Sequence, residues 1–268
     1  MALRTAAAVR REPRAPWRWA VAGALFGALV AAVQWAPARW LAQGLESATG
    51  GQLQLRDVRG TVWQGSAAVV LASSAGGVDR IALPGRMQWQ LRPAWLGVRG
   101  QLELGCCTQG PLGFAAGSAG SAGFRLAWDD GRSRCPAAML AGLGAPWNTL
   151  RLDGALALRT EALALRWSQG RLALDGRAVL DATDLSSSLS TLRPMGSYRL
   201  VLDGGPSPSL LLTTTQGALR LSGSGRWSGN TMRFGGEASA APGSEDALAN
   251  LLNIMGRREG ARSIINLG

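Results

Sequence analysis

The chain has 268 residues, of which 47% are hydrophobic and 17% charged, and this apolar composition excludes a disordered protein. It contains no histidine, which is the commonest general base and metal ligand, so we expect no enzyme, no cofactor and no metal site. The net charge is +11, but beyond the N-terminus the arginines are scattered singly, and we therefore expect no nucleic-acid partner.

The first element in chain order is an apolar segment, residues 19–36, with Gln34 as its only polar side chain. As a helix it spans about 27 Å, close to the ~30 Å hydrocarbon core of a bilayer. Five arginines precede it and only Arg39 lies in the fifteen residues after it. By the positive-inside rule, residues 1–18 form a cytoplasmic basic tail, 19–36 cross the lipid bilayer of the inner membrane, and 37–268 form a periplasmic domain. Tryptophans, which favour the two headgroup interfaces, flank the segment at Trp17, Trp19, Trp35 and Trp40.

A cleaved signal peptide has the same basic start and apolar core, and it is the alternative for this segment. Residues 36–38, Ala-Pro-Ala, resemble a small-residue cleavage site, although Pro37 fits poorly within it. The apolar run is also longer than the ~7–15 residues usual in a signal peptide. We therefore favour a retained anchor.

Strands are the main element predicted after the anchor, because apolar and polar residues alternate from residue 52 almost to the C-terminus. In residues 87–92, for example, Met, Trp and Leu alternate with Gln, Gln and Arg. The pair Asp-Gly, which tolerates the positive φ of tight turns, recurs at residues 130–131, 153–154, 175–176 and 203–204 and predicts hairpins there. The pattern predicts a mainly β fold: a curved antiparallel sheet or a sandwich with one apolar face.

A few short helices interrupt this pattern. We expect a short extension after the anchor (37–45), a helix that begins near Pro136 (135–143), and a helical turn carrying Leu185, Leu189 and Leu192. Ser244 is a candidate cap for a C-terminal helix that Gly256 ends, with an apolar stripe between them.

Residues 110–123 are rich in Gly, Ala and Ser, and we expect them to form a loop and a soft boundary within the β domain. Cys106, Cys107 and Cys135 flank this stretch and are the only cysteines. Export to the periplasm would permit a disulfide between Cys135 and either Cys107 or Cys106, and buried free thiols are the alternative.

The most distinctive motif follows the first predicted strand and reads Gly60-Thr61-Val62-Trp63-Gln64-Gly65. No Lys-Ser/Thr follows it, so it is no phosphate-binding loop. Two turn glycines around β-favouring residues indicate a packing motif centred on the tryptophan.

Together with its surroundings, this motif resembles the protein N family of the type II secretion system. The anchor, the Gly60–Gly65 motif and a W-x-L-x-P segment follow one another in the family's order. The family-like positions are Gly60, Thr61, Val62, Trp63, Gly65, Trp89, Pro93, Tyr198 and Trp227.

The resemblance implies an accessory inner-membrane component of the type II apparatus, a non-catalytic scaffold or assembly factor that supports export of folded periplasmic proteins across the outer membrane. Its implied partners are other type II secretion subunits. The sheet is also similar to that of AsmA-type envelope proteins, so handling of lipid on its apolar face is the alternative function. An apolar face that is closed and filled favours the scaffold, and an open groove favours lipid.

Overall fold

The computed structural model describes residues 17–72, 80–108, 110–118, 120, 123–144, 147–228 and 231–267. The chain divides into two compact units, residues 1–36 and 37–268. In the first unit, helix α1 (Trp17–Gln34) is long and apolar enough to cross a membrane and buries none of its residues. It begins and ends two residues earlier than the predicted span, and most of the predicted cytoplasmic tail, residues 1–16, lies outside the described residues.

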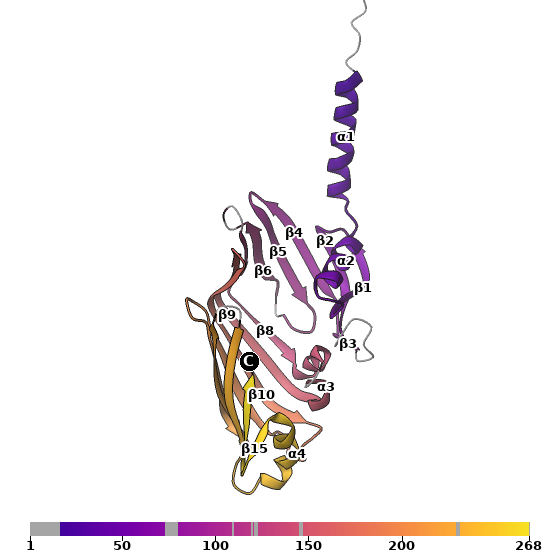
Figure 1. The fold of residues 1–268 in the computed structure, drawn as a ribbon. Helices are drawn as coiled ribbons and strands as arrows, with labels where there is room; N and C mark the ends of the chain where they lie inside the picture. Colours follow the sequence, from indigo (N-terminus) through magenta and orange to yellow (C-terminus); the bar gives the residue numbers. More distant parts are fainter. Residues whose placement is uncertain are drawn as a thin grey trace, which may run out of the picture. The chain divides into compact units, whose positions relative to one another are not determined.

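The second unit is built on one antiparallel sheet, to which all sixteen strands of the described residues belong (Figure 1). The mainly β fold is therefore confirmed, as a single curved sheet and without a second sheet packed on it among these residues. The strands are β1 (Leu53–Gly60), β2 (Gln64–Ala72), β3 (Arg80–Ala82), β4 (Met87–Ala94), β5 (Gly97–Leu104), β6 (Leu112–Ser118), β7 (Gly123–Trp128), β8 (Gly131–Pro136), β9 (Leu152–Ser168), β10 (Arg171–Ser187), β11 (Gly196–Asp203), β12 (Ser209–Gly217), β13 (Leu219–Ser228), β14 (Thr231–Ala240), β15 (Arg257–Glu259) and β16 (Arg262–Leu267).

The strand order follows the chain almost throughout, as in a long meander. Strand β9 is long enough to pair with β7 along one part of its edge and with β8 along another. The edge strands are β1 and β15, and the short β3 pairs only with β2.

Two of the predicted Asp-Gly turns are wrong. Asp153-Gly154 lies inside β9 and Asp175-Gly176 inside β10, and both long strands run on past these pairs. Each glycine has a positive φ, and the β9–β10 register shifts beside both pairs. The extra residue of each bulge is on the partner strand, near Ala162 in β9 and Asp184 in β10, so a left-handed glycine opposite a bulge and one in a hairpin turn have the same dipeptide signal.

The helices partly follow the predicted positions. Helix α2 (Ala38–Ala48) contacts β1, and the predicted helix near Pro136 is a 3₁₀ helix, η1 (Ala137–Leu143), with a short α3 (Trp147–Leu150) after it. Helix α4 (Glu245–Met255) contacts β14, β15 and β16, and the side chain of its N-cap residue, Ser244, makes no capping hydrogen bond.

Two other predictions on local structure are wrong. Leu185 lies within β10, near its end, and no helix forms around Leu189 and Leu192, which pack instead against the C-terminal core residues. Residues 112–118 are strand β6 rather than a loop, because Leu112 and Phe114 alternate with small residues that let neighbouring strands approach closely.

Buried apolar residues form two separate clusters. The N-terminal cluster comprises Ala38, Ala42, Leu55, Ala67, Val69, Leu83, Trp89 and Cys107. The C-terminal cluster comprises Ala137, Leu150, Leu152, Leu156, Ala182, Leu185, Met195, Tyr198, Leu219, Ala238, Leu248, Leu251 and Leu252. Helix η1 touches both clusters, because Met139 packs against the first and Leu140 against the second.

Candidate functional site

The Gly60–Gly65 motif is the tight connection between β1 and β2, and it encloses the indole of Trp89 from β4. Trp89 is 2% exposed, and its Nε1 donates to the carbonyl oxygens of Thr61 (3.3 Å) and Val62 (3.1 Å). A Cβ on Gly65 would collide with this indole, and Gly60 has a φ of 93°. The glycines are therefore required by the turn and by the tryptophan packed against it.

The other family-like residues lie apart from this turn. Pro93 pairs with Val98 at the end of β4, and Trp227 is half-buried near the end of β13. Tyr198 is buried in the C-terminal cluster, where its hydroxyl donates to the carbonyl of Leu219 at 3.1 Å. Burial raises the pKa of Tyr198, so this hydroxyl stays protonated and acts as a structural donor. The structure thus brings together Gly60–Gly65 and Trp89 but not the remaining positions.

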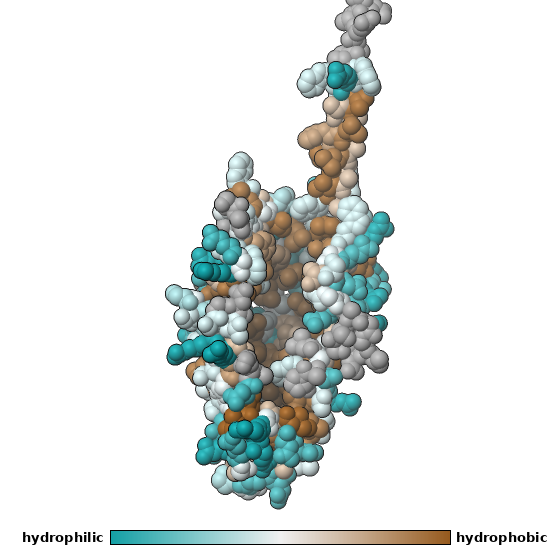
Figure 2. All heavy atoms as spheres, in the orientation of Figure 1, coloured by the Kyte–Doolittle hydropathy of each residue, from teal (hydrophilic) through white to brown (hydrophobic). Residues whose placement is uncertain are grey.

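Alternation gives the sheet an apolar inner face and a polar outer face. Figure 2 shows hydrophobic residues gathered within the hollow of the sheet, between hydrophilic rims. Helix α2 covers this face at the β1 end, η1 contacts β2, β3 and β9, and α4 covers the far end. Each end of the inner face is therefore closed by a helix on a filled cluster.

The middle of the inner face belongs to neither cluster. We call it the central strip, and it joins leucines in adjacent strands: Leu126, Leu158, Leu165, Leu174, Leu200 and Leu202. These side chains are half-buried or exposed, and none of them packs against either cluster. At its rim, Phe124, Trp167 and Leu172 align across three strands and are 47–50% exposed. An uncovered apolar row of this kind is typical of a binding surface.

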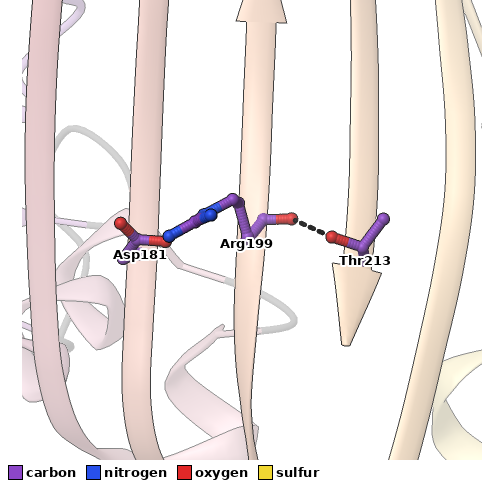
Figure 3. A network of polar contacts seen from close by, with 3 residues as sticks. All are labelled: Asp181, Arg199 and Thr213. Carbon is purple, nitrogen blue, oxygen red and sulfur yellow. Dashed lines mark hydrogen bonds and ion pairs between the residues drawn. The ribbon is translucent and has the colours of Figure 1, made fainter. Parts of the chain in front are cut away.

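The outer face carries the charged residues of the strands. In Figure 3, Arg199 of β11 lies between Asp181 of β10 and Thr213 of β12, with a 2.6 Å ion pair to the aspartate. That carboxylate raises the pKa of Arg199. Similar pairs join Arg166 to Asp175 and Arg262 to Glu237. Because these side chains are well exposed, the pairs add little stability, and they leave the outer face as a solvated, mixed-charge surface.

Two shallow hollows lie on the outer face. One, of about 330 Å³, is beside the β1–β2 turn and is lined by Gln64, Gln88, Gln90 and Gln101. The other, of about 560 Å³, lies over β12–β14 and is lined mainly by Thr and Ser residues with Arg220 and Glu237. Both linings are mostly polar, with Trp89 and Pro111 in the first and Leu221 in the second.

The three cysteines lie together between β5 and β8. Cys106 and Cys107 form the turn after β5, with their Sγ atoms 2.9 Å apart, and Cys135 is in β8. All three are thiols in the structure, and they are not placed to hold a metal ion.

Comparison with known families decides what kind of chain this is. The family model for type II secretion system (T2SS), protein N, matches residues 51–265, which covers all sixteen strands up to the middle of β16. The chain belongs to the T2SS protein N family. It is therefore a component of type II secretion, it is not an enzyme, and other secretion subunits are its partners.

Protein N is an envelope protein, and helix α1 fits either a membrane anchor or a signal sequence. Comparisons with curated proteins and with solved structures gave no match.

The sequence did not reveal the central strip. Each leucine in it is part of an ordinary alternating strand, and only the cross-strand register brings Leu126, Leu165 and Leu174 side by side in one row and places Leu158 and Leu200 on either side of Leu180 in another.

Proposed function

We propose that this protein N is a scaffold of the type II apparatus, anchored by α1 with its N-terminus in the cytoplasm and its sheet in the periplasm. The observation that carries the proposal is the family match over the whole sheet, combined with an outer face of exposed ion pairs rather than reactive groups. The excess of arginine before α1 supports the orientation.

The scaffold acts through contact, and β1 is the surface best suited to it. It is an edge strand of eight residues, so one row of its backbone groups has no partner strand in the sheet. The opposite edge, β15, has only three residues, and all of them are exposed and charged. A secretion subunit can add a strand to β1, with main-chain hydrogen bonds supplying affinity and the exposed Arg56 and Arg59 supplying charge.

In-cell photocrosslinking tests this proposal. A photoreactive residue replaces Arg59 on β1 in the full-length chain, in a strain that lacks the native gene, and the matched control replaces Arg226, an exposed arginine on the interior strand β13. We expect the Arg59 variant to crosslink to another secretion subunit and the Arg226 variant to do so at least tenfold less. Restored secretion of a type II substrate verifies that each variant works. Crosslinks of equal yield from both positions would exclude β1 as the contact edge.

The central strip favours a second candidate function, the handling of lipid. All strands beneath it are interior strands whose backbone groups are paired within the sheet, so it offers an occupant apolar contact but no hydrogen bonds. An acyl chain needs none, whereas an added peptide strand would leave its own N–H and C=O groups unpaired.

Native mass spectrometry of the detergent-purified full chain tests this second function. We expect one phospholipid to stay bound to the wild-type chain, and Leu165→Gln to reduce the bound fraction at least fivefold by placing an amide in the middle of the strip. Leu211→Gln is the matched control, because Leu211 is 49% exposed on the outer face. If both variants retain lipid equally, the bound molecule lies outside the strip.

A further inference from the structure

Three thiols meet where the sheet is weakly joined. Strand β8 is bound along one edge by β9, but within the described residues its other edge meets the turn after β5 through one isolated bridge, between Thr108 and Ser133. One hydrogen bond supports it, from the N–H of Arg134 to the carbonyl of Cys107 at 2.7 Å. We call this contact, between residues 107–108 and residues 133–134, the seam. It joins the N-terminal half of the sheet to β8, the strand that leads into η1.

The register of that bridge places Cys135 beside the two vicinal cysteines. Counting antiparallel from Thr108 and Ser133, Cys107 lies opposite Arg134 and Cys106 opposite Cys135. The thiol of Cys107 lies 2.9 Å from that of Cys106 and is close enough to that of Cys135 for the two to influence each other's pKa. Cys107 is also the most deeply buried of the three, at 4% exposed within the N-terminal cluster.

We propose that Cys107 and Cys135 form a disulfide that fastens this seam, while Cys106 stays a free thiol. The inference rests on the proposed periplasmic location, where thiols are oxidised. Each of the two cysteines gives up one proton and one electron. Both electrons pass to the disulfide of an envelope dithiol–disulfide oxidoreductase, which is released as a dithiol while the new S–S bond forms.

The bridge forms while the chain folds, before the cluster closes. Burial raises the pKa of Cys106 and of Cys107 to about 11, so both stay protonated at neutral pH in the folded protein. The thiolate is the reactive form, and exchange in the folded state is therefore slow. Once made, the bond closes a loop over residues 108–134, which contains β6, β7 and most of β8. Constraining so much of the unfolded chain stabilises the folded sheet.

Refolding with peptide mapping tests the bridge independently of where the protein resides. The full-length chain is refolded in detergent with a mixture of reduced and oxidised glutathione, alkylated and digested with trypsin. Because the chain has no lysine, trypsin cuts only after arginine, and it separates residues 100–125, with Cys106 and Cys107, from residues 135–151, with Cys135. We expect these two peptides to be joined and to carry one alkylated thiol. Three alkylated thiols, or a bond within residues 100–125, would overturn the proposal.

Single variants then identify the partner of Cys135. Reduction with dithiothreitol should lower the melting temperature of the wild type and of Cys106→Ser by roughly 5–10 °C. It should leave Cys107→Ser and Cys135→Ser unchanged. If Cys107→Ser still shows the full shift, Cys106 is the partner and the assignment is wrong. If the disulfide forms in this assay but Arg59 on β1 does not crosslink to a secretion subunit, the scaffold proposal is wrong and the disulfide proposal still holds.

Discussion

Gly65→Val is expected to lower the free energy of unfolding by about 3 kcal/mol, because it forces a side chain into the space of the buried indole of Trp89. The new Cβ would collide with Cζ2 of that indole and would lie 2.5 Å from the carbonyl oxygen of Arg59. Neither neighbour can move aside easily. The carbonyl of Arg59 is backbone, and the indole is held by hydrogen bonds from its Nε1 to the turn. Denaturant unfolding of the full chain, followed by circular dichroism, measures the loss.

Gly44→Ala is the matched control for that substitution. Gly44 lies exposed in α2, and a Cβ there would meet nothing within 4 Å. Removing a glycine from a helix is expected to stabilise it by about 0.5–1 kcal/mol. If Gly65→Val were as stable as this control, the turn would not hold the indole as described.

Leu248→Ala is expected to cost about 2–5 kcal/mol, the usual loss when a fully buried leucine is truncated. Leu248 is 0% exposed in α4, where it packs with Leu251 and Leu252 in the C-terminal cluster. The helix is also tied to the sheet by Ser263, whose hydroxyl donates to the carbonyl of Leu252 at 2.7 Å. A cavity under α4 therefore weakens the closed end of the inner face.

Ile254→Ala is the matched control, because Ile254 lies on the exposed side of the same helix. It shows how much of the stability loss comes from the change in helix propensity and how much from lost packing. Ile254 is 47% exposed, so its truncation should change the unfolding free energy by no more than about 0.5 kcal/mol. Both variants are compared by the midpoint and slope of a denaturant curve. Equal losses at the two positions would mean that α4 is not docked by its Leu248 face.

The sequence predicted the strands well because alternation is a local property, visible in each stretch such as residues 87–92. It predicted α4 for the same reason, since an apolar stripe and a terminal glycine are local signals. It failed where one local signal serves two structures. Asp175-Gly176 lies opposite a bulge in β9 instead of forming a turn, and the leucines at 185, 189 and 192 share a helical spacing without forming a helix.

The candidate site was predictable only in part. The glycines and tryptophan of residues 60–65 were recognisable as a packing motif, but the indole they enclose comes from Trp89, in another strand. That pairing depends on how β2 aligns with β4, which the hydrophobic pattern does not fix to a particular register. The contact between Cys135 and the vicinal cysteines likewise depends on a single bridge between segments far apart in the chain.

The meander order has a consequence for how the domain is made. Polypeptides are synthesised from the N-terminus, and here nearly every new strand pairs with the strand that came just before it. Each new strand can therefore pair with a strand that has already been synthesised. Few strands have to pair with a strand that is distant in the sequence, which favours rapid folding. Three strands also reach back past a neighbour in sequence: β4 pairs with β2, β9 with β7, and β16 with β14. The protein can assemble progressively as it emerges, with its final helix and strand completing the structure.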